Sequence, residues 1–176
     1  MKTKMIKLLS LAFLSVQLVA CGNSTTSNDN IEILNSTTLP AINSFVTGSI
    51  NTNLAQGFSS AAPYWTFNNF ASTFGNYLAP ARAIVGEIGV SQVPGYTSTF
   101  VTLIHSGRVA TRIYGMQSIN VRSGDVVYVG QAIGAFFTTG SLVFQVLVDG
   151  AAVCPLSYMS PTFRATFTTF GLPACQ

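Results

Sequence analysis

The sequence predicts an all-β fold for most of the chain. From Ala83 onward, short runs rich in Val, Ile, Thr, Phe and Tyr alternate with Gly, Ser, Asp and Pro, which is typical of short strands joined by tight turns. The run that begins at Ser141, SLVFQVLV, alternates with the two-residue period of a strand. Its two faces carry Leu142, Phe144, Val146 and Val148, and Val143, Gln145 and Leu147.

Seven strands follow from this pattern. They are predicted at residues 83–90, 97–106, 108–115, 119–123, 125–130, 131–137 and 141–150. Side chains from these runs are expected in the core: Val126, Val127, Val129 and Ile133. Aromatic residues crowd the segment before the first strand, and we expect them to pack in the core rather than to form a ligand-stacking platform. They are Tyr64, Trp65, Phe67, Phe70, Phe74 and Tyr77.

Residues 1–20 have the layout of an export signal, with three Lys followed by the apolar run LLSLAFLSVQLVA, which is too short to span a bilayer. The sequence LVAC at residues 18–21 resembles the bacterial lipobox. This resemblance implies that Cys21 is the lipid-modified first residue of the mature protein, held at a membrane surface. Gly22 resembles the residue found in lipoproteins sent to an outer membrane. The alternative is a signal cleaved nearby, with Cys21 an ordinary thiol.

The charge balance excludes a nucleic-acid partner. The formal net charge is +3, but all three lysines (Lys2, Lys4 and Lys7) lie in the export signal. The remaining chain holds five Arg and five Asp or Glu, so its net charge is near zero. Nucleic-acid binding requires a clustered basic face, which this composition does not provide.

Cys154 and Cys175 are the two cysteines that remain beyond Cys21. In an exported protein such a pair predicts a disulfide. A loop of this size contributes about 3 kcal/mol to stability by the loop-entropy estimate.

The segment before the β-region is expected to contain a flexible tether and one short helix. Residues 22–30 contain almost only Gly, Asn, Ser, Thr and Asp, which predicts a flexible tether. Apolar residues in the next stretch approximate helical spacing and indicate one short amphipathic helix, although its Gly and Thr content weighs against it. These residues are Ile42, Phe45, Val46, Ile50 and Leu54. We therefore divide the chain into a signal (1–20), a lipidated N-terminus with tether and helix (21–60), and a β-domain with a C-terminal tail (61–176).

Several segments resemble, in order, the lysostaphin-type (LytM) zinc endopeptidases, which have a duplicated-hybrid-motif β-fold and cut peptidoglycan. The most specific match is VRSGDVVYVGQAIG at residues 121–134, which resembles the family's Val-x-x-Gly-Asp-x-Val-x-x-Gly-Gln-x-Ile-Gly signature. The other matching segments are residues 83–88, 101–107, 111–116, 149–150 and 153–158. The resemblance implies a β-sandwich or barrel of this type.

The zinc-site positions of the family depart from its pattern. The resemblance places the late His-x-His pair on Ser141 and Val143, the His after Tyr on Met116, and finds no candidate for the early His-x-x-x-Asp motif. The one histidine, His105, falls on a structural turn of the family and is expected to be a hydrogen-bonded structural residue. A catalytic zinc needs three His, Asp, Glu or Cys ligands, so we expect no metal and no cofactor.

Other catalytic chemistry has less support. A Ser nucleophile would need His105 and an acid in one constellation, and no nucleophile-elbow motif is present. A carboxylate pair of Glu87 with Asp125 or Asp149 has no positive evidence, because both Asp residues lie in Gly-containing turn sequences.

The resemblance therefore implies a catalytically inactive, lipid-anchored relative of these peptidases. A groove bordered by Tyr114, Met116, Ser141 and Val143 would bind an envelope protein, such as a cell-wall hydrolase, or peptidoglycan. The expected location is the outer membrane, facing the periplasm. Two alternatives remain open: an active peptidoglycan metalloendopeptidase with other ligands, and a structural surface lipoprotein.

Overall fold

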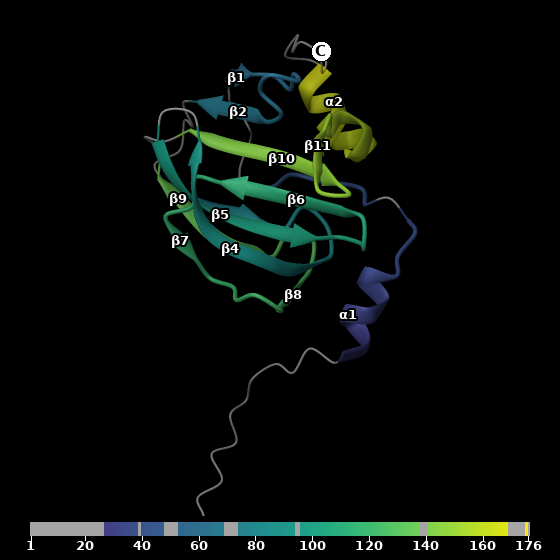
Figure 1. The fold of residues 1–176 in the computed structure, drawn as a ribbon. Coiled ribbons are helices and arrows are strands. Elements are labelled where there is room, and N and C mark those ends of the chain that lie inside the picture. The colour runs from purple at the N-terminus through teal and green to yellow at the C-terminus, as the bar shows by residue number, and fades with distance from the viewer. Residues whose placement is uncertain are drawn as a thin grey trace, which may run out of the picture.

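The computed structural model consists of two antiparallel β-sheets with short helices near both ends of the described chain (Figure 1). The structure describes residues 27–38, 40–47, 53–68, 74–93, 96–137, 141–168 and 175. The predicted all-β class is confirmed.

The larger sheet contains most of the strands. These are β1 (Asn53–Gln56), β2 (Trp65–Asn68), β4 (Ala83–Val93), β5 (Tyr96–Ile104), β6 (Val109–Tyr114), β8 (Val126–Val127), β10 (Leu142–Val148) and β11 (Ala151–Val153). Their order is β1-β2-β10-β6-β5-β4-β8, and β11 pairs with β10. The smaller sheet has the order β3-β9-β7, with β3 (Phe74–Leu78), β7 (Ser118–Ile119) and β9 (Ala132–Phe137).

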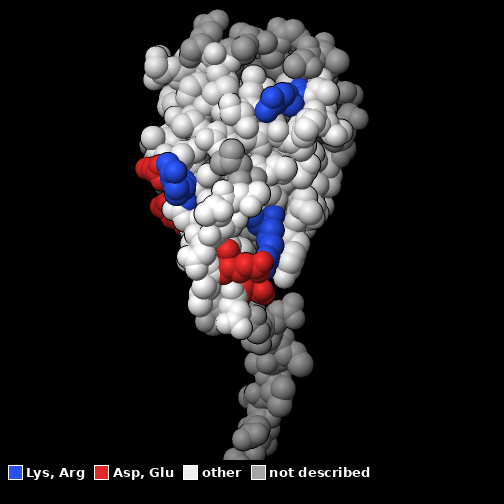
Figure 2. All heavy atoms as spheres, turned by 90° about the vertical axis from the view of Figure 1, so that its right-hand side faces the viewer, with Lys and Arg blue, Asp and Glu red and all other residues white. Residues whose placement is uncertain are grey.

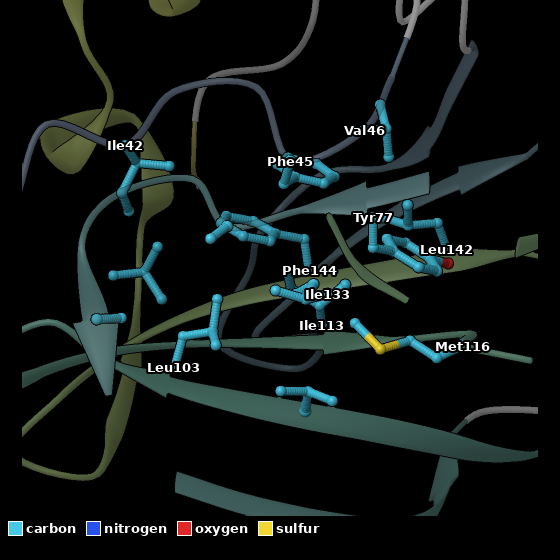
Figure 3. Packing of buried hydrophobic residues seen from close by; sticks show 14 of the residues in the cluster. Ile42, Phe45, Val46, Tyr77, Leu103, Ile113, Met116, Ile133, Leu142 and Phe144 are labelled. Atoms are coloured by element: carbon cyan, nitrogen blue, oxygen red, sulfur yellow. The ribbon is translucent and has the colours of Figure 1, made fainter. Parts of the chain in front are cut away.

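Strand β10 lies in the interior of the larger sheet and its predicted alternation is confirmed. Leu142, Phe144 and Val146 are at most 1% exposed and belong to the main core. The ring of Phe144 stacks on that of Phe45, with centroids 4.3 Å apart. Val143 belongs to a separate cluster. Figure 3 shows the main core, in which Phe144, Ile113 and Leu103 of the larger sheet meet side chains from elsewhere in the chain.

Most of the predicted core residues are buried, with one correction. Val126, Val127 and Ile133 are buried, but Val129 is 58% exposed. The strand β8 ends after two residues because the chain turns, with the Gln131 backbone N–H donating to the Tyr128 carbonyl oxygen. This turn places Val129 at an exposed corner.

The aromatic residues before β4 are largely core residues, as predicted. Trp65, Phe67 and Tyr77 are at most 2% exposed, and Tyr64 is half-buried. Phe70 and the side chain of Phe74 lie outside the described residues.

The helix predicted from Ile42 onward is wrong. Ile42 and Val46 form isolated bridges with Met159 and Tyr77, so this segment is extended rather than helical. Its apolar side chains are buried on several neighbours at once, which overrides their helical spacing. Leu54 lies in β1, and Ile50 is outside the described residues. Since residues 42–46 share the main core, the folded body also begins before the expected boundary at residue 61.

A helix, α1 (Ser27–Leu34), occupies part of the segment predicted to be a tether. Tertiary contacts explain it: Ile33 is 4% exposed against the sheet, and Arg82 forms ion pairs with Asp29 at 3.1 Å and Glu32 at 2.9 Å. Cys21 and the rest of the predicted tether, residues 22–26, lie outside the described residues.

The C-terminal region contains the 3-10 helix η1 (Pro155–Tyr158) and the helix α2 (Pro161–Thr168), which was not predicted. Phe163 and Phe167 pack α2 onto the core, with the Phe167 ring centroid 4.9 Å from that of Trp65. A disulfide joins Cys154 and Cys175, whose Cα atoms are 5.6 Å apart. No helix in the described ranges has both the length and the apolar content needed to cross a bilayer.

The assignment of Phe144 to the main core and of Val129 to the surface can be tested by truncating each side chain. We expect Phe144→Ala to lower the free energy of unfolding by roughly 3–5 kcal/mol, because it leaves a cavity in the main core. The matched variant Val129→Ala removes an exposed side chain and should change it by less than about 0.5 kcal/mol. Urea denaturation monitored by circular dichroism measures both, and equal effects would contradict the burial described above.

Candidate functional site

Two of the residues expected to border a groove, Tyr114 and Val143, lie on the outer face of the larger sheet, the face opposite the main core. Along this face the strand register places Gly89, Phe100, Tyr114, Val143 and Thr66 side by side, from β4 through β5, β6 and β10 to β2. We call these five residues the aromatic row. Phe100, Tyr114 and Val143 pack together as a cluster, with Tyr64 against them.

Longer polar side chains cover the aromatic row. The neighbouring row across the sheet contains Thr102, Arg112 and Gln145, which we call the polar row. The Arg112 guanidinium lies 4.7 Å from the centroid of the Phe100 ring. The Tyr114 hydroxyl donates to Gln145 Oε1 at 3.0 Å, and Gln145 Nε2 donates to the Pro63 carbonyl oxygen at 3.0 Å.

This cover closes the three central residues of the aromatic row to solvent. Val143 is 2% exposed, Phe100 4% and Tyr114 6%. Their apolar atoms are therefore packed within the chain. What faces outward at this place is Arg112 and Gln145 of the polar row together with Glu87, which bonds to Arg112 at 3.0 Å.

Two of the four predicted groove residues, Tyr114 and Val143, are direct neighbours on adjacent strands. Ser141 is half-buried just before β10, and its carbonyl oxygen lies against Gly115 so closely that a Cβ on that glycine would come within 2.8 Å. Gly115 has a φ of 93°, a conformation that favours glycine.

The expectation that Met116 borders the groove is wrong, because the chain turns at Gly115 just before it. Met116 is 4% exposed and belongs to the main core, on the opposite side of the sheet from the aromatic row. Figure 3 shows its side chain near those of Ile113 and Leu142. The predicted groove therefore does not have Met116 on its border.

His105 is a structural residue, as expected. It is 5% exposed, with Nδ1 3.0 Å from the Arg82 carbonyl oxygen and Nε2 2.9 Å from Thr111 Oγ1. Because a carbonyl oxygen can only accept, Nδ1 carries the proton and Nε2 accepts from the Thr111 hydroxyl. Burial lowers the pKa of His105 to about 4, so the ring is neutral at pH 7. Both ring nitrogens are occupied and neither is available to a metal.

The acidic side chains are engaged as well. Arg82 and Arg112 hold Asp29, Glu32 and Glu87 in ion pairs. Asp149 lies at a turn with a φ of 50°, and the hydrogen bond from Arg108 holds the pKa of its carboxyl below the usual value. Asp125 Oδ2 accepts from the Arg122 backbone N–H at 2.7 Å. Both Asp residues thus stabilise turns, as the sequence predicted.

The donor set does not fit a catalytic zinc. At the positions that the family resemblance assigns to zinc chemistry stand a buried thioether (Met116), an aliphatic side chain (Val143) and a hydroxyl (Ser141), whereas zinc is held by imidazole, carboxylate and thiolate groups. Within the described part of the chain, no three His, Cys, Asp or Glu residues gather closely enough to hold a metal ion.

Two cavities lie elsewhere, on either side of the segment that follows α1. One of about 510 Å³ is lined by Glu32, Arg82 and His105 together with residues 35–38. The other, of about 480 Å³, is more apolar and includes Val109, Val148 and Tyr158. Neither includes a residue of the aromatic row. No sequence pattern predicts them, because they depend on the docking of α1.

The sequence matches no family model, and no curated protein matches it. Solved structures do share its fold. A chain of the SpoIIQ-SpoIIIAH pore-forming complex superposes with a TM-score of 0.56 at 17% identity, over 70% of this chain and 93% of that one. Csd3 from Helicobacter pylori gives 0.55 at 20% identity, over 75% of this chain, which spans only 40% of Csd3.

The catalytic domain of the antimicrobial peptidase lysostaphin from Staphylococcus simulans gives a TM-score of 0.50 at 22% identity, over 61% of this chain and 92% of that domain. The chain thus has the fold found in lysostaphin-type peptidases and in the SpoIIQ-SpoIIIAH complex. At these identities the likeness concerns the fold.

The buried imidazole predicts a specific loss of stability in acid. The pKa of His105 is about 4 in the folded chain and 6.5 when unperturbed, so between these pH values the unfolded chain binds more protons. The contribution of His105 to the free energy of unfolding is fully present above about pH 6.5. It is lost as the pH falls toward 4, and the loss is roughly 3 kcal/mol.

His105→Gln removes this titration. The variant should be less stable at pH 7, yet the difference in unfolding free energy between wild type and variant should shrink as the pH is lowered from 7 to 4. Urea titrations of both proteins across this range measure it. A difference that stays constant with pH would contradict the neutral, buried state of His105.

Proposed function

We propose that this chain is a lipid-anchored envelope protein whose lysostaphin-like β-domain has lost peptidase chemistry and acts by binding. One observation carries the proposal: the residues at the expected zinc positions are engaged in packing. Val143 is enclosed in the aromatic row and Met116 in the main core. His105 uses both of its ring nitrogens in hydrogen bonds. Restoring a zinc site would therefore require both new ligands and a new arrangement of the side chains around them.

The outer face supports a protein as the partner. Substrates of peptidases and other small molecules are bound in concave sites, but the aromatic row is covered and presents the polar row instead. Arg side chains are enriched at protein interfaces, and Arg112 of the polar row is only half-buried. The SpoIIQ-SpoIIIAH structure, a complex of two proteins, shares this fold and agrees with such a use. Binding to peptidoglycan remains the second candidate, because the fold is also that of the peptidase lysostaphin.

The membrane anchor is part of the proposal. Cys21 follows an apolar export signal directly, in a sequence that resembles the lipobox. We propose that it carries the lipid and holds the β-domain at the outer membrane, facing the periplasm.

The loss of peptidase chemistry predicts that the purified domain does not cut peptidoglycan. Residues 22–176 incubated with sacculi and added zinc should release no soluble fragments, because no set of ligands positions the metal. Fragment release is measured by chromatography, with an active lysostaphin-type peptidase as the positive control on sacculi that it cleaves. Chelator-sensitive release by this chain would overturn the proposal in favour of an active metalloendopeptidase.

Partner binding through the outer face can be tested by photo-crosslinking in whole cells. A photoreactive amino acid at Glu87, which lies on the outer face with its side chain 61% exposed, should yield a protein-sized adduct. The same group at Arg164, which is exposed on α2, is the matched control and should yield none. Adducts are detected by immunoblotting. Equal crosslinking at both positions, or none at Glu87, would count against the outer face as the binding surface and leave a structural role.

A further inference from the structure

Exposed apolar side chains gather at one end of the molecule. Among the described residues, the large hydrophobic side chains that are exposed are Ile31 (54%), Leu34 (46%), Tyr128 (53%), Val129 (58%) and Val90 (66%). The first two belong to α1, and the next two to the turn after β8. Figure 1 shows α1 and β8 at the same end of the body, and Ile33 of α1 and Val126 of β8 belong to one apolar cluster with Ile84.

The two sides of α1 differ in chemistry. With 100° between successive residues, Asp29, Glu32 and Ile33 share one side of the helix, and Ile31 and Leu34 lie on the opposite side. The first side is bound to the body through Arg82 and the Ile33 packing. The second side carries no charged residue. An uncharged apolar strip thus points away from the protein, and the turn after β8, with its exposed Tyr128 and Val129, lies at the same end of the body.

Charge at this end gives no electrostatic attraction to an anionic surface. Asp29, Glu32 and Asp125 stand against Arg82 and Arg122, so the local balance is one negative charge. Figure 2 shows acidic and basic side chains in contact at the lower end of the body. Any attraction of the strip to another surface must therefore come from apolar burial.

The length of chain before α1 indicates which surface this is. Residues 22–26 separate Cys21 from Ser27, the first residue of α1. Six extended residue steps reach at most about 21 Å. If Cys21 carries the lipid, as proposed above, the start of α1 cannot lie further than this from the bilayer surface, and the exposed Ile31 and Leu34 follow within the same helix.

We infer that Ile31, Leu34, Tyr128 and Val129 form a membrane-contact patch that inserts into the leaflet holding the lipid of Cys21. This inference rests on the lipid anchor of the proposed function. The patch is too small to hold the protein at a bilayer alone, but the anchor keeps it at high local concentration there. The body is then held in a fixed orientation on the membrane.

The test supplies the anchor chemically. In the chain beginning at Cys21 the other two cysteines form a disulfide, so Cys21 is the free thiol and can be coupled to maleimide lipid in phosphatidylcholine vesicles. An Ile31→Trp variant then reports contact with lipid. We expect its fluorescence to be quenched about threefold more strongly by lipids brominated in the acyl chain than in Val90→Trp, and to be insensitive to 1 M salt.

Val90→Trp is the matched control, because this exposed position lies seven residues along β4 from Ala83, or about 23 Å from the α1 end of the strand. Adding Leu34→Glu to Ile31→Trp should abolish the difference. Equal quenching at both positions would overturn the inference, as would absence of quenching at Ile31→Trp. A blue-shifted Ile31→Trp emission that depends on protein concentration without vesicles would instead assign the patch to a second copy, which also overturns it.

The proposed function is tested separately, by the mass of Cys21 peptides from native membranes. An unmodified Cys21 there would contradict the lipid anchor, whatever the vesicles show. A lipidated Cys21 with no quenching at Ile31→Trp would leave the anchor standing and remove only the membrane-contact patch.

Discussion

The alternation of side chains along β10 is the constraint on which the rest of this structure depends. Its inward residues, Leu142, Phe144 and Val146, fill the main core, so the outward direction of Val143 and Gln145 is fixed by the two-residue period. A shift of one residue would expose the inward set and bury Gln145. The register with β6 then places Tyr114 beside Val143, and the register of β6 with β5 adds Phe100. The chemistry of the outer face is therefore a consequence of core packing.

The same constraint explains why Val143, one of the expected zinc positions, is enclosed. A metal site on this face would need donors in the aromatic row, yet these positions are filled by residues that pack on each other and are covered by Arg112 and Gln145. The Arg112 guanidinium covers the Phe100 ring, and the Gln145 amide accepts the hydrogen bond of the Tyr114 hydroxyl. This leaves no unpaired polar group in this cluster. The outer face is thus stable without a ligand, and its outward groups suit an interface with another surface.

The sequence predicted the parts of the fold that local pattern determines. Two-residue alternation and turn glycines placed most of the strands between Ala83 and Val148, and two cysteines predicted the disulfide. The strands predicted at 119–123 and 125–130 are reduced to the two-residue strands β7 and β8. It failed where contacts distant along the chain decide. The polar sequence of α1 is helical because Ile33 is buried against the sheet and Arg82, some fifty residues away, pairs with its acidic side chains. Ile42 and Val46 have helical spacing but are used by an extended segment, and Met116 is turned inward by the positive φ of Gly115, which the spacing of residues does not reveal.

The position of α1 connects the anchor to the outer face. Ile33 of α1 packs on Ile84 and Val126, which lie on the same outer face of the larger sheet as the polar row. Residues on one face of a strand recur every two positions, about 6.6 Å apart. Phe100 therefore lies only about 13 Å from Ile104, with Thr102 between them. A partner on the outer face would therefore lie beside α1 and close to the membrane in which we propose that the lipid of Cys21 is inserted. Such proximity favours a partner that is itself held near the bilayer, because both proteins would then meet at a high effective concentration.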